Sequence, residues 1–178
     1  MRNLLVLVLT PLCLAAVMQA AVAAEPNALG MSPQAVANKG TLFICGGGRA
    51  PEPVYKEFVR LSGGRKARIV LITSAYAYRD QAQVEDRFGG WREMGAESLV
   101  FLNAKSREEA DSEKFAVPLT RATSVWIAGG SQSRLMRLCS GTKTEQAVRD
   151  VLNRGGVVGG TSAGAAAMSS LIIRYGYT

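Results

Sequence analysis

One segment of the sequence has residue types and spacing that fit a catalytic nucleophile. Gly160, Ser162 and Gly164 have the G-x-S-x-G spacing of a nucleophile elbow. A strand that turns sharply into a helix crowds its own backbone, so the flanking positions favour glycine. The serine then lies at the tip, where N–H groups at the helix start can stabilise an oxyanion. We predict that Ser162 is the nucleophile; the open alternative is a turn that binds phosphate or only packs closely.

Short apolar runs alternate with amphipathic segments along the chain before this elbow. Strands are expected over 41–45, 67–72, 98–102, 125–128 and from 157 into the elbow; helices are expected from Pro51 and Pro53, over 80–94 with a break at 89–90, from Ser106, and over 144–152. This alternation predicts an α/β fold, a parallel sheet with helices on both faces. Sites in such sheets lie beyond the carboxyl ends of the strands. We therefore expect the loops 46–49, 73–78, 129–134 and 161–164 to converge on Ser162.

Two of these loops carry motifs that can be compared with a known family. Residues 129–135 read GGSQSRL and residues 160–165 read GTSAGA, and a glycine triplet follows the first strand at 46–48. Together they resemble the cyanophycinase and aspartyl dipeptidase (peptidase E) family of serine peptidases, from about residue 39 to the end. The resemblance implies a fold like the class I glutamine amidotransferases, with serine in place of their cysteine nucleophile.

The same resemblance implies roles for individual residues. Ser162 would attack the peptide carbonyl, and the backbone N–H groups of Gly130 and Ala163 would form the oxyanion hole. Residues assigned to substrate binding are Gly129, Ser131, Gln132 and Arg134. The alternative is a strand-exit turn at the glycines and a solvated helix start at the side chains. The implied substrate is a peptide or cyanophycin-like polymer, cleaved at aspartyl or β-aspartyl-arginine bonds, and neither a cofactor nor a metal is expected.

The sequence departs from this family in one respect that matters for chemistry. It contains no histidine, whereas the family supplies one downstream of the serine to act as base. Residues 171–177 read as the middle of a domain, so we expect 39–178 to be a partial peptidase domain that lacks its C-terminal part and is nearly inactive alone. On this view Val157 and Val158 would be uncovered, and the chain would aggregate unless a partner chain completes the sheet.

Two other functions remain open from the residues. The first is a non-catalytic module of the same fold that binds a small anion or a peptide at the glycine-rich loops. The second is an α/β-hydrolase esterase, which shares the elbow spacing but also requires a histidine and gains nothing from the motif at 129–132. A Ser–Lys pair could replace histidine in principle, but no lysine, Lys143 included, has a spacing that singles it out.

The N-terminus predicts export. One arginine, an apolar stretch to about Met18 and small residues at 21–24 describe a signal peptide over 1–24, followed by a linker over 25–38. We expect a secreted or periplasmic protein without membrane association after cleavage. The formal net charge of +7 comes from dispersed basic residues, which does not favour nucleic-acid binding. Pairing between Cys45 and Cys139, and assembly into a homo-oligomer, remain open.

Overall fold

Six parallel strands form one sheet in the computed structural model, which describes residues 6–8, 39–48 and 50–169. Their spatial order is β1-β2-β6-β5-β3-β4. The strands are β1 Val6–Val8, β2 Thr41–Cys45, β3 Arg68–Ile72, β4 Ser98–Leu102, β5 Ser124–Ile127 and β6 Val157–Thr161. Because all neighbours are parallel, the loops that follow the strands leave the sheet at one edge. The five strands expected from the sequence are confirmed to within two residues at their starts.

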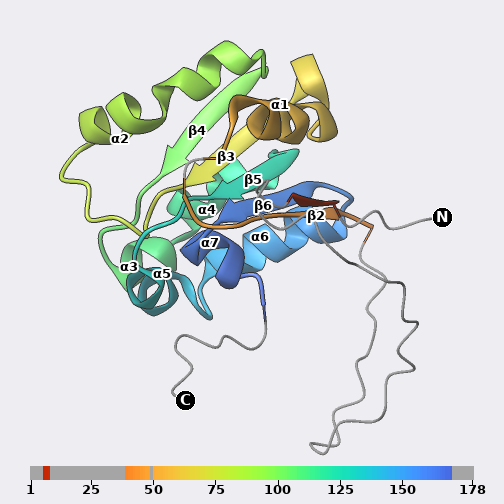
Figure 1. Cartoon of the computed structure of the whole chain (residues 1–178). Coiled ribbons are helices and arrows are strands. Elements are labelled where there is room, and N and C mark those ends of the chain that lie inside the picture. Colours follow the sequence, from red (N-terminus) through yellow and green to blue (C-terminus); the bar gives the residue numbers. More distant parts are fainter. Residues whose placement is uncertain (1–5, 9–38, 49, 170–178) are drawn as a thin grey trace, which may run out of the picture.

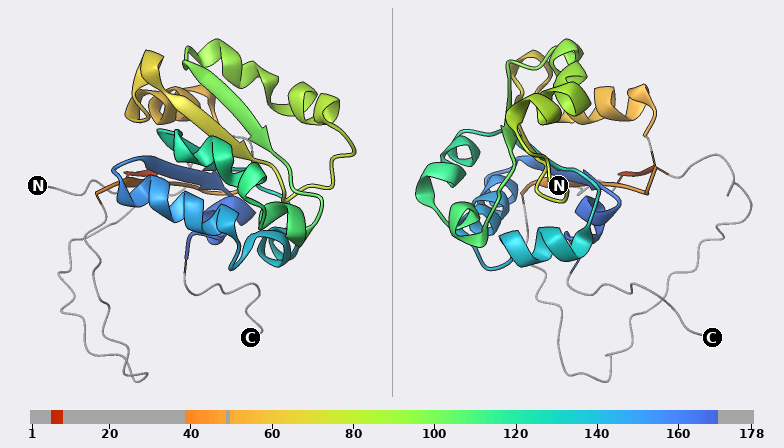
Figure 2. Two further views of the ribbon diagram at one scale, coloured as in Figure 1. Left: turned by 180° about the vertical axis from the view of Figure 1, so that it is seen from behind. Right: turned by 90° about the vertical axis from the view of Figure 1, so that its left-hand side faces the viewer.

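Helices cover both faces of the sheet, as the alternating pattern predicts (Figures 1 and 2). On one face lie α1 Glu52–Leu61, α2 Gln81–Phe88 and the 3₁₀ turn η2 Gly89–Met94, with η1 Gly64–Lys66 after α1. On the other lie α4 Glu113–Thr120, α5 Gln132–Cys139, α6 Lys143–Asn153 and α7 Ala163–Ala166, with α3 Arg107–Ala110 beside α5. The α/β prediction is therefore confirmed. Neither α4, which contains Pro118, nor the extent of α5 was predicted.

Side-chain caps explain where several helices begin. The carboxylate of Asp80 accepts from the N–H of Gln83 at 3.0 Å and starts α2. The hydroxyl of Ser106 accepts from the N–H of Glu109 at 3.2 Å and starts α3, as the capping-box spacing predicts. The expected break at Gly89 is also present, since α2 ends at Phe88 and the chain tightens into η2.

The two faces of the sheet bury different kinds of side chain. Under α1 and η2 the rings of Phe43, Phe58, Trp91 and Trp126 pack mainly edge to face, with centroids of Phe58 and Trp126 5.0 Å apart. The opposite face is aliphatic, built from residues such as Val125, Val151 and Val158. A Cβ on Gly159 would lie 2.9 Å from the Phe58 ring and 3.0 Å from Trp126. This glycine of the nucleophile strand therefore makes room for the aromatic core.

The expectation that Val157 and Val158 are uncovered is wrong. They are 4% and 3% exposed, because β6 lies between β2 and β5 and contacts α1, α6 and α7. An apolar groove of about 260 Å³ remains on the aliphatic face, lined by Leu42, Leu135, Val148, Leu152 and Met168 among others. No helix among the described residues is long and apolar enough to span a bilayer.

Two further sequence expectations concern the N-terminus and the cysteines. Val6–Val8, inside the predicted signal peptide, forms β1 beside β2; the rest of 1–24 and the linker 25–38 lie outside the described residues. The Cys45 and Cys139 thiols are free. Burial raises the pKa of both thiols, that of Cys139 to about 11, which favours their protonated forms at neutral pH.

Candidate active site

Ser162 lies at the turn between β6 and α7 in a backbone conformation that side chains rarely adopt. Its φ is +51° and its ψ is −119°, and it is the one residue besides glycine with positive φ in the described part of the chain. Its N–H donates to the carbonyl oxygen of Cys45 at 3.3 Å, across to the end of β2. Such a conformation costs on the order of 1–3 kcal/mol and persists where the surroundings enforce it. The backbone thus has the strain expected of a nucleophile elbow.

The two glycines of the elbow are required by close backbone contacts. A Cβ on Gly164 would lie 2.1 Å from the carbonyl oxygen of Ile127, and one on Gly160 would lie 2.8 Å from the carbonyl carbon of Gly164. Real Cβ atoms do not approach backbone atoms this closely. The G-x-S-x-G spacing therefore has the steric cause inferred from the sequence: α7 crosses directly over the ends of β5 and β6.

The Ser162 side chain is exposed at the carboxyl edge of the sheet. A Cβ on Gly47 would lie 3.8 Å from its Oγ, and one on Gly129 would lie 3.1 Å from its Cβ. The loops after β2 and β5 therefore meet at the serine, as expected. Thr161 adds a link, since its hydroxyl donates to the carbonyl oxygen of Gly46 at 2.8 Å.

No described side chain forms a hydrogen bond with Ser162 Oγ. Lys56 is the lysine that lines the adjoining cavity, but its ammonium forms an ion pair with Glu52 at 2.6 Å. That pairing, chiefly through its hydrogen bond, lowers the pKa of the Glu52 carboxyl. Lys143 pairs instead with Glu113 at 3.2 Å. Within the described residues, the structure therefore provides a positioned serine without a partnering base.

Gly130 and Ala163, predicted to form the oxyanion hole, lie on the two loops that meet at Ser162. Neither N–H donates to an acceptor among the described residues, so both remain available. Gly130 has φ +139°, and a Cβ there would lie 2.9 Å from both the Ala75 carbonyl oxygen and the Tyr76 ring. The loop after β3, which contains Ala75 and Tyr76, therefore packs directly against Gly130. Stabilisation of an oxyanion by these groups stays a prediction.

The structure does not bring Ser131, Gln132 and Arg134 into the cavity lining beside Ser162. The hydroxyl of Ser131 caps α5 by accepting from the N–H of Arg134 at 3.2 Å. The Nε of Arg134 donates to the carbonyl oxygen of Ser74 at 3.1 Å. Gln132 is half-buried in the first turn of α5. These contacts are those of a helix start, and the predicted substrate contacts of the three residues stay predictions.

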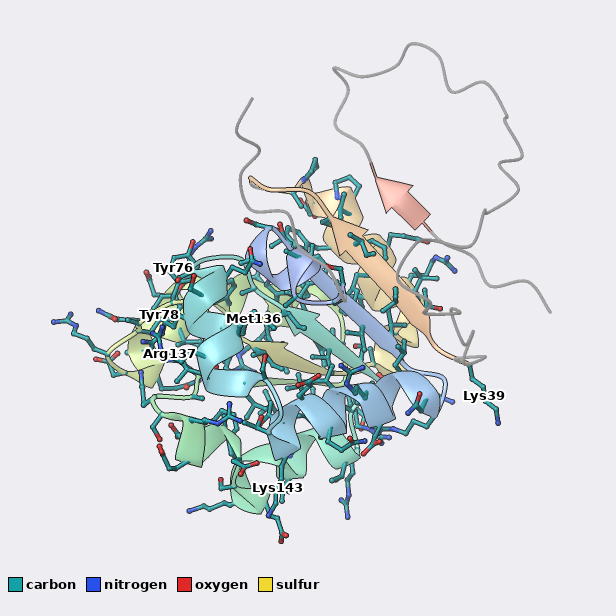
Figure 3. The ribbon with its side chains drawn as sticks, turned by 90° about the horizontal axis from the view of Figure 1, so that it is seen from below. Lys39, Tyr76, Tyr78, Met136, Arg137 and Lys143 are labelled. Atoms are coloured by element: carbon teal, nitrogen blue, oxygen red, sulfur yellow. The ribbon has the colours of Figure 1, made fainter. Side chains whose placement is uncertain are left out.

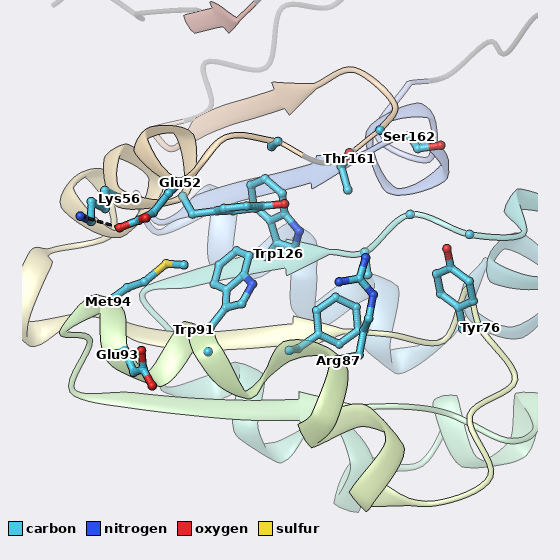
Figure 4. A pocket seen from close by; sticks show the side chains of 18 residues that line it. Glu52, Lys56, Tyr76, Arg87, Trp91, Glu93, Met94, Trp126, Thr161 and Ser162 are labelled. Carbon is cyan, nitrogen blue, oxygen red and sulfur yellow. Dashed lines mark ion pairs between the residues drawn. The ribbon is translucent and has the colours of Figure 1, made fainter.

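A cavity of about 660 Å³ extends from Ser162 along the aromatic face of the sheet (Figure 4). Gly129, Gly130, Thr161 and Ser162 lie at one end, and Glu52, Glu93 and Met94 line it further away. Tyr55, Trp91 and Trp126 form its apolar wall, with the ring centroids of Tyr55 and Trp91 4.9 Å apart. Nothing in the sequence pattern indicates that these aromatic residues line a cavity, because the spacing does not show that one edge of the cluster is open.

Tyr76 and Arg87 were also missed, and both line the cavity. Tyr76 is 46% exposed and its ring centroid lies 5.4 Å from that of Tyr78 (Figure 3). Burial raises the pKa of the Tyr78 phenol, with Arg87 opposing the shift. Tyr76 follows β3 in a loop that the sequence did place at the site. No sequence pattern indicates that Arg87 lines the cavity, since it lies in an ordinary polar helix.

The described residues contain no group of three His, Cys, Asp or Glu side chains placed to hold a metal ion. The arrangement is a serine on a strained turn, two unpaired N–H groups beside it, and a deep cavity that can receive a ligand. Chemically, this suits attack on a carbonyl carbon and stabilisation of the oxyanion that results.

Comparison with known proteins gives a family model and relatives that match this chain. A family model described as peptidase family S51 matches residues 42–178. Cyanophycinases from Geminocystis herdmanii and Trichormus variabilis are each 32% identical, over 125 and 146 residues, which is 69% and 79% of this chain. The chain spans only 45% and 48% of the length of these two relatives.

A solved structure of a peptidase from an acI-B1 actinobacterium shares the fold. It superimposes with a TM-score of 0.62 over 74% of this chain and 57% of that chain, at 24% identity. At this identity the likeness concerns the path of the backbone and supports the parallel α/β architecture.

Proposed function

This chain belongs to peptidase family S51, and we propose on that premise that it is a serine peptidase whose nucleophile is Ser162. The observation that supports the proposal most directly is the conformation of Ser162, with φ +51° between two glycines that accept no Cβ. A fold does not maintain such strain without a compensating role, and strained residues of this kind cluster at active sites.

The proposed chemistry is acyl transfer. Ser162 Oγ attacks the carbonyl carbon of a peptide bond and gives its proton to a base, while the N–H groups of Gly130 and Ala163 stabilise the oxyanion. The C–N bond then breaks, the amine leaves with a proton, and water hydrolyses the serine ester. Proton transfer by a positioned base contributes about 10²–10⁴ in rate. Because the sequence contains no histidine, we expect the 178-residue chain itself to turn over slowly.

For the substrate we propose peptides cleaved at aspartyl or β-aspartyl-arginine bonds. Support comes from the relatives at 32% identity, which are named cyanophycinases. The net charge of +7 is compatible with acidic peptides. We further propose that residues 1–24 direct export; fusion of 1–30 to a reporter active only outside the cytoplasm tests this, and an inactive fusion would contradict it.

The nucleophile can be tested without relying on turnover. We expect a fluorophosphonate to label the protein once, with intact mass and peptide mapping placing the adduct on Ser162. Ser162→Ala should lose the label, whereas Ser133→Ala, a change of another exposed serine, should keep it. Hydrolysis of cyanophycin and aspartyl dipeptides by a full-length relative, with and without the equivalent serine change, then tests the substrate class. Labelling that persists in Ser162→Ala removes this serine from the mechanism.

A second function is favoured by one observation: Ser162 Oγ has no hydrogen-bonding base among the described residues. On this reading the chain binds a small anion or a peptide without cleaving it. Calorimetry with aspartyl dipeptides and with inorganic phosphate separates the two functions. Binding without turnover or labelling, and unchanged by Ser162→Ala, supports the binding module.

A further inference from the structure

Arg87 is a cation in the wall of the Ser162 cavity that pairs with no carboxylate of the described residues. It lies in the last turn of α2, and its guanidinium carbon lies 5.4 Å from the centre of the Phe88 ring. Among the described residues it forms neither an ion pair nor a hydrogen bond. Figure 4 shows its side chain rising between Trp91 and Tyr76 toward the strand ends that carry Thr161 and Ser162.

Other arginines on this chain show the contrast. Arg60 and Arg149 each pair with a glutamate three or four residues away on the same helix, at 2.6 and 2.5 Å. Arg92 in η2 pairs with Glu85 in α2 at 2.7 Å. Lys56, the second cation in the cavity wall, is occupied by Glu52. The remaining acid of the wall, Glu93, lies toward the end of the cavity far from Ser162 (Figure 4). The cavity therefore has an unpaired positive charge toward its Ser162 end.

We propose that Arg87 is a specificity-determining residue that binds a carboxylate of the substrate in the Ser162 cavity. The inference rests on the proposed peptidase function. A guanidinium presents paired donors that match a carboxylate, and it keeps its charge at any working pH. Arg87 is exposed, and the Phe88 ring contacts its guanidinium from one side. The adjoining part of the substrate lies along Trp91 and Trp126.

The chain carries its own reporter for this binding. It has two tryptophans, Trp91 and Trp126, and both line the cavity. A ligand that enters the cavity should therefore change the intrinsic fluorescence, whether or not it is cleaved. The probe is L-aspartyl-L-leucine, compared with asparaginyl-leucine and aspartyl-leucinamide, each of which replaces one carboxylate by a neutral amide of similar shape.

We expect Arg87→Gln to weaken aspartyl-leucine binding about tenfold or more, the usual effect of losing a charge-assisted bidentate pair. One of the two amides should bind the unaltered protein correspondingly weakly and should be insensitive to Arg87→Gln. Arg87→Lys, which keeps the charge but not the fork, should give an intermediate affinity. Arg79→Gln removes the same charge from an exposed residue outside the cavity lining and should change nothing.

Three outcomes overturn the inference: no fluorescence change with aspartyl-leucine, equal weakening by Arg87→Gln for the acid and both amides, or equal weakening by Arg79→Gln. Thermal unfolding of each variant accompanies the titrations. If Arg87→Gln lowers the unfolding midpoint, the affinity of Arg87→Lys is used to test the inference instead. Fluorophosphonate labelling of Ser162 in the Arg87→Gln variant separates the two proposals. If Ser162 is labelled but binding does not depend on Arg87, only this inference is overturned. If binding depends on Arg87 but Ser162 is not labelled, only the assignment of Ser162 as nucleophile is overturned.

Discussion

The two loops that meet at Ser162 resemble each other in sequence but are held in place by different means. Both are glycine-rich, follow a buried strand and lead into a helix. At the elbow, backbone presses on backbone, and Gly160 and Gly164 have no room for a side chain. At 129–134, hydrogen bonds fix the loop. The hydroxyl of Ser131 caps α5, and the side chain of Arg134 donates a hydrogen bond to the carbonyl oxygen of Ser74.

The residues of the two loops differ in how directly they contact Ser162. The elbow's residues are each explained by contacts within a few ångströms of Ser162. The motif at 129–134 mixes two roles, because its glycines contact the serine and the neighbouring loop while its side chains build a helix start. A motif can thus contain residues that contact the site and residues that cap a helix, while the substrate contacts expected of Ser131, Gln132 and Arg134 stay predictions.

The largest expected effect is at the elbow. Gly164→Ala places a Cβ 2.1 Å from the Ile127 carbonyl oxygen, and neither backbone can yield without moving α7 or β5. We expect the free energy of unfolding to fall by about 3 kcal/mol. Gly90→Ala, where a Cβ meets nothing within 4 Å, should change it by less than about 0.5 kcal/mol. Equal losses in urea unfolding would contradict the steric account.

The corresponding change in the other loop should be milder. Gly130→Ala meets the Ala75 carbonyl oxygen and the movable Tyr76 ring, both at 2.9 Å, and keeps φ +139°. We expect a loss of about 2 kcal/mol. Gly46→Ala, with open space around its Cβ, serves as the control. A loss as large as that of Gly164→Ala would mean that backbone contact governs both loops alike.

A glycine in place of Ser162 should make the protein more stable. Ser162→Gly removes the Cβ that makes φ +51° unfavourable, and we expect the free energy of unfolding to rise by about 1 kcal/mol while labelling is lost. Ser162→Ala keeps the Cβ and should leave stability nearly unchanged. If the two variants are equally stable in thermal unfolding, the elbow stores no strain.

The smallest effects separate two neighbours on α5. Arg134→Gln removes the hydrogen bond to Ser74 and should lower the free energy of unfolding by about 1 kcal/mol without changing aspartyl-leucine affinity. Gln132→Ala should leave stability within about 0.5 kcal/mol and weaken peptide binding, as the family resemblance implies. A reversed pattern in paired unfolding and fluorescence titrations would exchange their roles.

Much of the fold could be predicted from sequence because local signals and burial agree. Strands such as Ser98–Leu102 are short apolar runs, and the starts of α2 and α3 follow from Asp80 and Ser106. Helix α4 was missed because Pro118 and the short apolar stretch around it interrupt the helical pattern, which tertiary packing of Leu119 overrides. The burial of Val158 was missed because its cover was expected to come from a missing C-terminal part, whereas β2, β5 and α6 supply it.

The candidate site could be predicted in part for the same reason. Ser162 and its flanking glycines are adjacent in sequence, and local geometry dictates their identities. Arg87 and Trp91 approach the serine only through the packing of α2 and η2 against the sheet. The spacing of residues along the chain does not show this approach. In the sequence, Arg87 therefore cannot be distinguished from other arginines near the end of a helix.

Strand β6 is the last described strand along the chain, yet it lies inside the sheet between β2 and β5. Val157 pairs with Thr41, so more than a hundred residues must be made before β2 can pair with β6. Closing such a long loop loses entropy before any contact repays it, so we expect folding to be slow. On the ribosome, β2 and the edge of β5 therefore remain without their shared partner β6 until residue 161 emerges. We expect the nascent chain to be most prone to aggregation in that interval.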